Sequence, residues 1–587
     1  MRSRKAVFSL TLLQLVALAT VAGTWTAVTS KPSYDYAYVT FEGGDYKTHE
    51  GQPGSGDKWV AKGRFNNRIN ETGWSYLWVE TNPKGNNDSM QAFAAGLVEG
   101  NLTAPLIRMS GKNSWEGQCQ NLSSTYCAKM TKFLIMNLIW MKEMIAEKAK
   151  TNPFWHMINL YICQLEALQS VYSSEYGCEG CLPELYWLQF YSELADISKA
   201  LMLPPEVYYM RKGSCSAMIK VLPGNKDLYV AHDTWNTYSS MLRVLKSYDF
   251  SYHTLPTSQV KVPGRKITFS SYPGLLLSMD DYYVISSGMV AMETTIENNN
   301  VEIAAKNTVP RGCVLEGLRV MAANRLAANI HQWANEFSSY NSGTYNNMWM
   351  VLDYHKFEPN KELPNSDLLL VLEQMPGYIM FQDLTKKLKN DTYWGSYNVP
   401  HWAVAKLGHC LSKGFLVEKF FSKIVKISGQ QDLINKYGDI YTYNNTPRAK
   451  IMRRDHVKVK DMKTMIKLMR YNNYKKDPLS RCECDPAENA ALAISARSDL
   501  NPRNGTYRFK FLGHRAHGAI DMKLTNSTLI KDLSFIAIAG PTCDDVPIFQ
   551  WSKAGFNDSV PHFGHPDIFK FPPYVFGDDV KPFYRDQ

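Results

Sequence analysis

The order of periodic segments along the chain most constrains its fold. Three stretches repeat apolar residues at helical spacing, at 128–150, 153–172 and 183–202. After residue 213 the pattern changes to short strand-like runs, interrupted by predicted helices at 238–248 and 314–337. The runs are at 214–222, 228–235, 267–273, 280–288, 289–297, 348–354 and 368–380. Strands segregated from helices predict a layered α+β body with a mostly helical N-terminal portion.

The composition is that of a globular protein with a large core. Of 587 residues, 45% are apolar and 20% are charged, which is typical of folded domains. The formal charge is +10, but it is spread along the chain. Basic runs such as KKLK (386–389) and RAKIMRR (448–454) contain or adjoin apolar and acidic residues. A nucleic-acid-binding protein would gather this charge on one face, so we expect no nucleic-acid partner.

Residues 1–23 are predicted to form a secretory signal peptide. Arg2, Arg4 and Lys5 precede an apolar run that ends in small residues. The alternative is a signal anchor, but the run is short for a membrane span, and no later segment is long enough. We therefore expect no stable span after cleavage. N-linked glycans are expected at nine N-x-S/T sequons: Asn70, Asn87, Asn101, Asn121, Asn390, Asn444, Asn504, Asn526 and Asn557.

Eleven cysteines, an odd number, should leave one thiol unpaired in an oxidising compartment. Close spacing makes disulfides possible for Cys119 with Cys127, for Cys178 with Cys181 and for Cys482 with Cys484, although a ring closed across one residue is strained. Structural zinc is the alternative. It would need four thiolate or imidazole ligands, to which His514 and His517 could contribute.

Cys215 is the candidate for the unpaired thiol. It opens the first of two strand-like runs, which are separated by the turn sequence PGNKD (223–227). A hairpin closed there places residue 215 opposite residues 232–235, so His232, Thr234 and Trp235 become its neighbours. The alternative is a free cysteine that only fills core space.

Many separated stretches after residue 210 resemble the phospholipase B-like family. They include GSCSAMIKVLPG (213–224), AHDTWNTY (231–238), SSYPG (270–274), NSGTYNNMWMVLDY (341–354), YWGSYNVP (393–400), PRAKIMRRD (447–455), MRYNNYKKDPLS (469–480) and ENAALAISARSDLNPRNGTY (488–507). The last stretch, with HGAIDMKLT (517–525), looks nearer to the lysosomal phospholipase B-like 2 branch than to the phospholipase B-like 1 branch. That branch carries a CxxC where this chain has CEC at 482–484. The pairing of Cys482 and Cys484 is therefore undecided, and Cys178 or Cys181 is the alternative partner.

The resemblance implies an N-terminal nucleophile hydrolase, which has an αββα sandwich fold and a precursor cut between Ser214 and Cys215. A terminal cysteine carries a thiol nucleophile and an α-amine base, whose reference pKa is about 7.7–8. Two associated chains are implied: a mostly helical one of residues 24–214, and one of residues 215–587 that carries the nucleophile and most of the core.

The resemblance also implies the residues of the site. Besides the Cys215 thiol, Asn398 would supply an amide donor to an oxyanion hole and Arg448 a fixed positive charge. His232 and Thr295 would orient the amine or thiol, and Trp235 would wall the pocket. We assign catalysis to Cys215, His232, Asn398 and Arg448, and substrate binding to Trp235 and Thr295. No metal and no cofactor are implied.

The leading functional prediction is a self-processing hydrolase that cleaves an acyl ester or amide, on a lipid or amide substrate, in the lysosome lumen or after secretion. The chain contains no G-x-S-x-G and no HExxH, so neither a serine lipase nor a zinc protease is favoured. The alternative is a lumenal binding or accessory glycoprotein that cuts itself but turns over little substrate. The oligomeric state stays open.

Overall fold

The computed structural model describes residues 33–114, 124–176, 184–203, 214–403 and 427–584. The predicted signal peptide lies outside these ranges, as do Cys119, Asn121, Cys178 and Cys181.

One large sheet has eleven strands, in the order β13-β12-β11-β10-β9-β8-β7-β4-β3-β1-β2. Each neighbouring pair is antiparallel except β4 with β7, which run parallel. The strands are β1 (Asp35–Glu42), β2 (Asp45–Glu50), β3 (Trp59–Arg68), β4 (Trp74–Thr81), β7 (Val244–Asp249), β8 (Lys266–Ser271), β9 (Tyr282–Ile285), β10 (Met289–Thr295), β11 (Asn347–Asp353), β12 (Leu369–Met375) and β13 (Tyr378–Asp383).

A second sheet has eight strands, with β14-β5-β6-β18-β19-β22-β23 along its main path and β17 paired to β6. Its strands are β14 (Tyr393–Ser396), β5 (Ser214–Val221), β6 (Leu228–Thr237), β17 (His517–Ala519), β18 (Asp521–Thr525), β19 (Phe535–Ala539), β22 (Tyr574–Phe576) and β23 (Val580–Pro582). Two-stranded sheets pair β15 (Cys484–Asp485) with β16 (Thr506–Tyr507), and β20 (Phe549–Gln550) with β21 (Ile568–Phe569).

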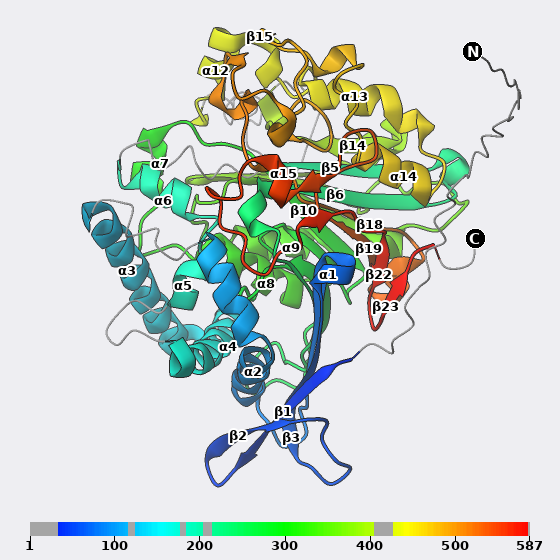
Figure 1. Ribbon diagram of the computed structural model, residues 1–587. Coiled ribbons are helices and arrows are strands. Elements are labelled where there is room, and N and C mark those ends of the chain that lie inside the picture. Colours follow the sequence, from blue (N-terminus) through cyan, green and yellow to red (C-terminus); the bar gives the residue numbers. More distant parts are fainter. Residues whose placement is uncertain (1–32, 115–123, 177–183, 204–213, 404–426, 585–587) are drawn as a thin grey trace, which may run out of the picture. The chain divides into compact units, whose positions relative to one another are not determined.

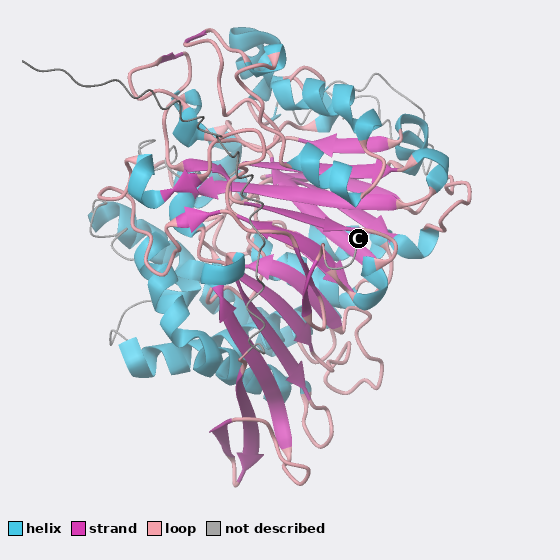
Figure 2. Cartoon of the chain, turned by 45° about the vertical axis from the view of Figure 1, so that its right-hand side comes forward, coloured by secondary structure: helices cyan, strands magenta, loops and turns pink. Residues whose placement is uncertain are grey.

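The two large sheets pack against each other, and helices cover their outer faces (Figures 1 and 2). One core cluster joins Met292 and Met350 of the large sheet to Ala217 and Val230 of the second sheet. The same cluster includes apolar residues of α13 (Pro447–Asp455) and α14 (Met462–Met469). A second cluster joins the other face of the large sheet to helices. These include α2 (Asp88–Ser114), α3 (Ser124–Lys148), α4 (Pro153–Tyr176), α8 (Glu316–Leu326) and α9 (Ile330–Ser338).

The predicted layering of helices and strands is confirmed, as are the predicted helices at 128–150 and 153–172, which are α3 and α4. Two other predicted helices are each divided. The stretch 183–202 forms α5 (Glu184–Gln189) and α6 (Leu194–Ala200), and 314–337 forms α8 and α9. In the second case Asn329 caps α9, because its side chain accepts hydrogen bonds from the backbone nitrogens of His331 and Gln332.

The predicted helix at 238–248 is wrong. A single turn at Tyr238–Ser240 is followed by strand β7, which pairs with β4 on one side and β8 on the other. Residues 244–248 are all buried, and a strand buried on both faces loses the alternation that distinguishes it from a helix. The N-terminal portion is also less helical than predicted, since β1 to β4 precede α2.

The predicted hairpin of β5 and β6 is confirmed. Gly224 and Asn225 adopt φ angles of 71° and 54° at its turn, a conformation that glycine and asparagine tolerate. The backbone nitrogen of Leu222 closes the turn on the carbonyl of Asp227 at 2.9 Å. This turn fixes the register of the two strands and hence the neighbours of Cys215.

Candidate active site

Cys215 is the second residue of β5 and lies opposite Thr234 of β6, with Ser214 opposite Trp235. The predicted placement among residues 232–235 is therefore confirmed. The side chain of Cys215 is 4% exposed, so in the uncut chain the thiol is closed off from solvent.

Two predicted residues hold the backbone of Cys215. The Asn398 side-chain oxygen accepts a hydrogen bond from the Cys215 nitrogen at 3.0 Å, and Arg448 Nη1 donates to the Cys215 carbonyl. Arg448 Nη2 also donates to Asn398 Oδ1 at 2.9 Å. Because both groups that face this Asn398 atom are donors, the atom is the amide oxygen.

Asn398 links this site to the large sheet. Its side-chain nitrogen donates to the carbonyl of Thr295 at 2.8 Å, and its backbone nitrogen donates to Thr294 Oγ1 at 3.3 Å. The residue adopts φ 66°, a left-handed conformation in which asparagine is enriched. In the uncut chain the amide nitrogen of Asn398 is thus bound to Thr295, and its oxygen faces Cys215.

Trp235 and Arg448 stack against each other. The Arg448 guanidinium lies 4.2 Å from the centre of the Trp235 ring, and the indole nitrogen donates to the Ile494 carbonyl at 3.2 Å. Burial lowers the pKa of Arg448 to about 10, so the side chain remains cationic at neutral pH. Trp235 therefore supports the arginine that holds Cys215.

His232 is fully buried, and its Nε2 lies 2.9 Å from the carbonyl oxygen of Glu293. A carbonyl only accepts, so Nε2 carries the hydrogen and Nδ1 carries a lone pair. Burial, with the nearby Lys523 ammonium, holds the pKa of His232 well below its usual range. Within the described part of the chain Nδ1 has no hydrogen-bond partner. The imidazole is therefore neutral.

Burial raises the pKa of the Cys215 thiol well above its ordinary value, and the Glu293 carboxylate adds to the rise. The backbone N–H of Trp235 and the charge of Lys523 act in the opposite direction. In the uncut chain the sulfur is thus a protonated thiol, and any reaction needs a group that removes this proton.

A buried ionic network beside the hairpin was not predicted. Lys523 Nζ lies 2.6 Å from Thr234 Oγ1 and 2.7 Å from Asp521 Oδ1. Arg243 contacts both Asp521 and Asp280. Each of these five side chains is at most 3% exposed. A sequence signal exists: Asp521 and Lys523 alternate with apolar residues in AIDMKLT (519–525), and a charge in a buried strand requires a partner.

The cysteines are only partly as predicted. Cys482 and Cys484 form a disulfide, and Cys127 is also disulfide-bonded. Four described cysteines are free, at 163, 215, 313 and 543. The expectation of a single unpaired thiol is therefore wrong.

Seven of the nine sequon asparagines are exposed: Asn70, Asn87, Asn101, Asn390, Asn444, Asn504 and Asn557. Asn526 differs. It is 4% exposed, and its side-chain nitrogen, the atom that would carry a glycan, donates to Asp227 at 2.6 Å. This geometry argues against the site at Asn526.

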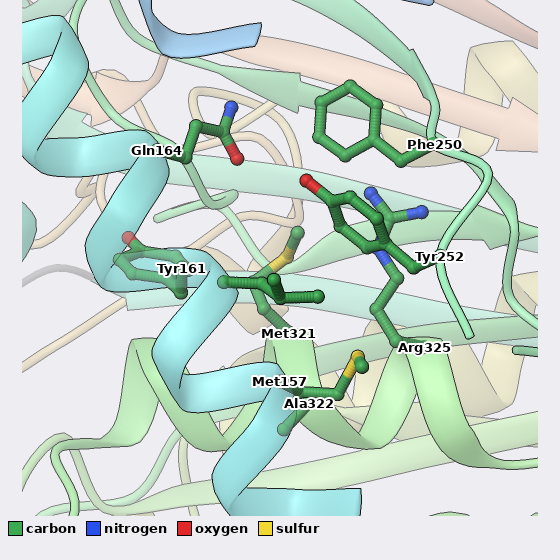
Figure 3. A pocket seen from close by; sticks show the side chains of 9 residues that line it. Met157, Tyr161, Gln164, Phe250, Tyr252, Met321, Ala322 and Arg325 are labelled. Atoms are coloured by element: carbon green, nitrogen blue, oxygen red, sulfur yellow. The ribbon is translucent and has the colours of Figure 1, made fainter. Parts of the chain in front are cut away.

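A small cavity lies away from Cys215, between α4, α8 and the stretch after β7 (Figure 3). Its volume is about 20 Å³, enough for water but not for a lipid or peptide.

At the surface, the atoms of His331, Asp367 and Asp383 that could bind a metal ion lie within 4.8 Å of one another. His331 and Asp367 already pair there at 2.8 Å. Among the described helices none is long and apolar enough to cross a membrane.

Comparison with known proteins identifies the family. The sequence model of the Phospholipase B family matches residues 61–576. Mouse (Mus musculus) phospholipase B-like 2 is 44% identical over 523 residues, which cover 88% of this chain and 84% of the mouse protein. Phospholipase B-like 1 of Caenorhabditis elegans is 38% identical, covering 88% and 87%. Phospholipase B-like protein B of Dictyostelium discoideum is 33% identical, covering 87% and 84%. These relationships support a hydrolase, and the chain belongs to the phospholipase B-like family.

Proposed function

We propose that this protein is a self-processing acyl hydrolase that uses Cys215 as an N-terminal nucleophile, on the αββα scaffold of N-terminal nucleophile hydrolases. The observation that carries the proposal is the hydrogen bond from the Cys215 nitrogen to Asn398. Cutting the Ser214–Cys215 bond turns this nitrogen into an α-amine that Asn398 already holds. Nucleophile and base then share one residue.

Self-cleavage uses the same thiol. The sulfur gives up its proton and attacks the Ser214 carbonyl carbon, the carbon–nitrogen bond breaks, and the departing nitrogen takes up the proton that the thiol lost, which leaves a thioester between Ser214 and Cys215. Water hydrolyses this thioester to the Ser214 carboxylate and the free thiol. Residues 24–214 and 215–587 then form two chains, which the pairing of β4 with β7 and the shared hydrophobic core keep together.

Turnover repeats this chemistry on an external substrate. The α-amine, whose reference pKa is about 7.7–8, accepts the thiol proton, and the sulfur attacks the carbonyl carbon of an ester or amide. The amine then protonates the departing alcohol or amine, and water releases the acid. Arg448 acts as a positioning residue that holds both Cys215 and Asn398. Trp235 supports the Arg448 guanidinium, and the Thr295 carbonyl holds the Asn398 amide. His232 is buried and neutral beside these residues.

The names of the relatives favour a lipid ester as substrate, whereas the proposed scaffold is equally suited to amides. The predicted signal peptide and the exposed sequons favour the secretory route, and the resemblance to phospholipase B-like 2 favours the lysosome as destination. We also propose that these exposed asparagines carry N-linked glycans.

One observation favours the second candidate, an accessory glycoprotein that cuts itself but turns over little substrate. The thiol is buried, and the described cavity does not include it. The two candidates separate when purified mature protein and a Cys215→Ala variant are assayed on matched lipid esters and acyl amides. The hydrolase proposal expects turnover by the wild type alone, with a thioester that hydroxylamine traps. Equal activity in both proteins would remove it.

A further inference from the structure

The cavity of Figure 3 has room for one small ligand. Three of its lining side chains can form hydrogen bonds into it: Gln164 of α4, Tyr252 after β7 and Arg325 of α8. Each of the three is at most 5% exposed. The other lining residues are Met157, Leu160, Tyr161, Phe250, Met321 and Ala322. A volume of about 20 Å³ holds a water molecule or a monatomic ion but no larger group.

Two buried polar atoms at this cavity lack a partner. Within the described part of the chain, neither the side-chain nitrogen of Gln164 nor the Tyr252 hydroxyl has a hydrogen-bond partner. Figure 3 shows the amide and the hydroxyl pointing toward one another, yet no hydrogen bond joins them. Burial raises the pKa of the Tyr252 hydroxyl, so it keeps its proton. Both groups can therefore donate to a ligand that lies between them.

Arg325 brings a positive charge that no carboxylate balances. Its Nη1 donates to the carbonyls of Gly264, at 2.8 Å, and Arg265, and its guanidinium lies 4.8 Å from the centre of the Phe250 ring. Among the residues that the structure describes, Nε and Nη2 form no hydrogen bond and no ion pair. Burial lowers the pKa of Arg325 to about 10, so the side chain stays cationic at neutral and acidic pH. A buried charge of this kind requires a counter-charge.

The carboxylates closest in influence are engaged elsewhere. Asp249 acts on the charge of Arg325, but it pairs with Arg265 at 2.6 Å. Asp88 acts on Tyr252, but it is held between two histidines at 2.9 and 3.0 Å. None of the nine residues that line the cavity carries a carboxylate. The cavity thus offers hydrogen-bond donors and one positive charge, without an opposing negative charge.

We propose that this cavity binds a chloride ion, with Arg325 as its counter-charge and with Gln164 and Tyr252 donating hydrogen bonds to it. A water molecule would satisfy the two donors but would leave the charge of Arg325 without a partner. A phosphate or carboxylate group is too large for the cavity. After the proposed cut, Gln164 belongs to the first chain and the other two residues to the second, so the ion links both chains. Binding itself does not depend on the cut.

Bromide identifies the ligand directly, because it replaces chloride and scatters X-rays anomalously. Crystals of the purified protein are soaked in sodium bromide, and anomalous difference maps are calculated. We expect a bromide peak in the cavity, between the Gln164 amide, the Tyr252 hydroxyl and the Arg325 guanidinium. Water in the cavity with no bromide peak, or bromide at the protein surface alone, would overturn the inference.

Thermal unfolding tests the same site in solution. Midpoints are measured in sodium chloride and in sodium gluconate at equal ionic strength and pH, since gluconate is too large to enter. Chloride at about 100 times its dissociation constant should raise the wild-type midpoint by about 2 °C. Gln164→Glu places a carboxylate beside Arg325, so it should abolish this chloride dependence and unfold at a higher temperature than wild type in gluconate. Gln52→Glu makes the same change at an exposed position and should keep the full dependence.

Equal wild-type midpoints in the two salts would contradict the inference, as would equal chloride dependence in Gln164→Glu and Gln52→Glu. If Gln164→Glu does not fold, Gln164→Leu takes its place. It removes the amide without adding charge and should weaken the chloride dependence. The measurements can also be made on the uncut Cys215→Ala chain, so a failure of the proposed self-cleavage leaves this test intact.

Discussion

Asn398 joins Cys215 of one sheet to a strand of the other. Its side-chain oxygen accepts from the Cys215 nitrogen at 3.0 Å, and its side-chain nitrogen donates to the Thr295 carbonyl at 2.8 Å. A displacement between β5 and β10 would therefore break one of these bonds. The site depends on the packing of the two sheets.

Replacing Asn398 by glycine should slow self-cleavage by about 10- to 100-fold, because three side-chain hydrogen bonds, with Cys215, Arg448 and Thr295, are lost, which corresponds to about 1–3 kcal/mol in the transition state. Glycine keeps the positive φ without strain. Asn398→Asp retains an acceptor for Cys215 and should cut faster than the glycine variant. The measurement is a time course of fragment formation after synthesis. Equal rates for the two variants would show that the Cys215 contact does not matter.

The hairpin and its thiol were predictable because turn chemistry and strand pattern are local features. The contacts of Asn398 and Arg448 were not, since they join residues 183 and 233 positions apart in the sequence from Cys215. The resemblance named these two residues. In the uncut chain the amide nitrogen of Asn398 donates to the Thr295 carbonyl and its oxygen accepts from Cys215, so the role of Asn398 as a donor to an oxyanion stays a prediction. Strand β7 was predicted as a helix from its local pattern. It forms a strand instead because its pairing with neighbouring strands on both sides overrides that pattern.

Arg448→Lys should be destabilising by about 3 kcal/mol, as the loss of hydrogen bonds made by a charged group implies, and should slow cleavage, although the charge is kept. A lysine ammonium cannot reach Cys215, Tyr397 and Asn398 together as the guanidinium does. Thermal unfolding and fragment formation measure the two effects. Arg453→Lys, on the exposed side of the same helix, is the control and should change neither. Wild-type stability in Arg448→Lys would contradict this account.

Stability should fall between about pH 4.5 and pH 7 because of Glu193. Burial raises the pKa of this carboxyl to about 7, so the folded state holds a proton that the unfolded chain loses near pH 4.5. At low pH the Glu193 carboxyl therefore contributes about 3 kcal/mol to the free energy of unfolding relative to its contribution at high pH. This contribution is lost as the pH rises to about 7. Glu193→Gln should flatten the dependence of unfolding free energy on pH. If Glu193→Gln leaves this pH dependence unchanged, a group other than Glu193 causes it.

Glycan occupancy should follow exposure. Mass spectrometry of protein secreted by animal cells should find glycans at the exposed sequons and none at Asn526, whose side-chain nitrogen is bound to Asp227. An Asn390→Gln variant should lose one glycan and keep its stability, since that side chain is exposed. A glycan on Asn526 in folded protein would contradict the packing of β18 against the turn of the hairpin.

Sequencing the N-terminus of the large fragment tests the central claim most directly. Full-length wild type and Cys215→Ala are produced in parallel and brought to acidic pH. The account predicts a wild-type fragment of residues 215–587 that begins with Cys215, and an intact chain in the variant. A fragment that begins elsewhere, a wild type that stays uncut, or normal cutting of Cys215→Ala would contradict it.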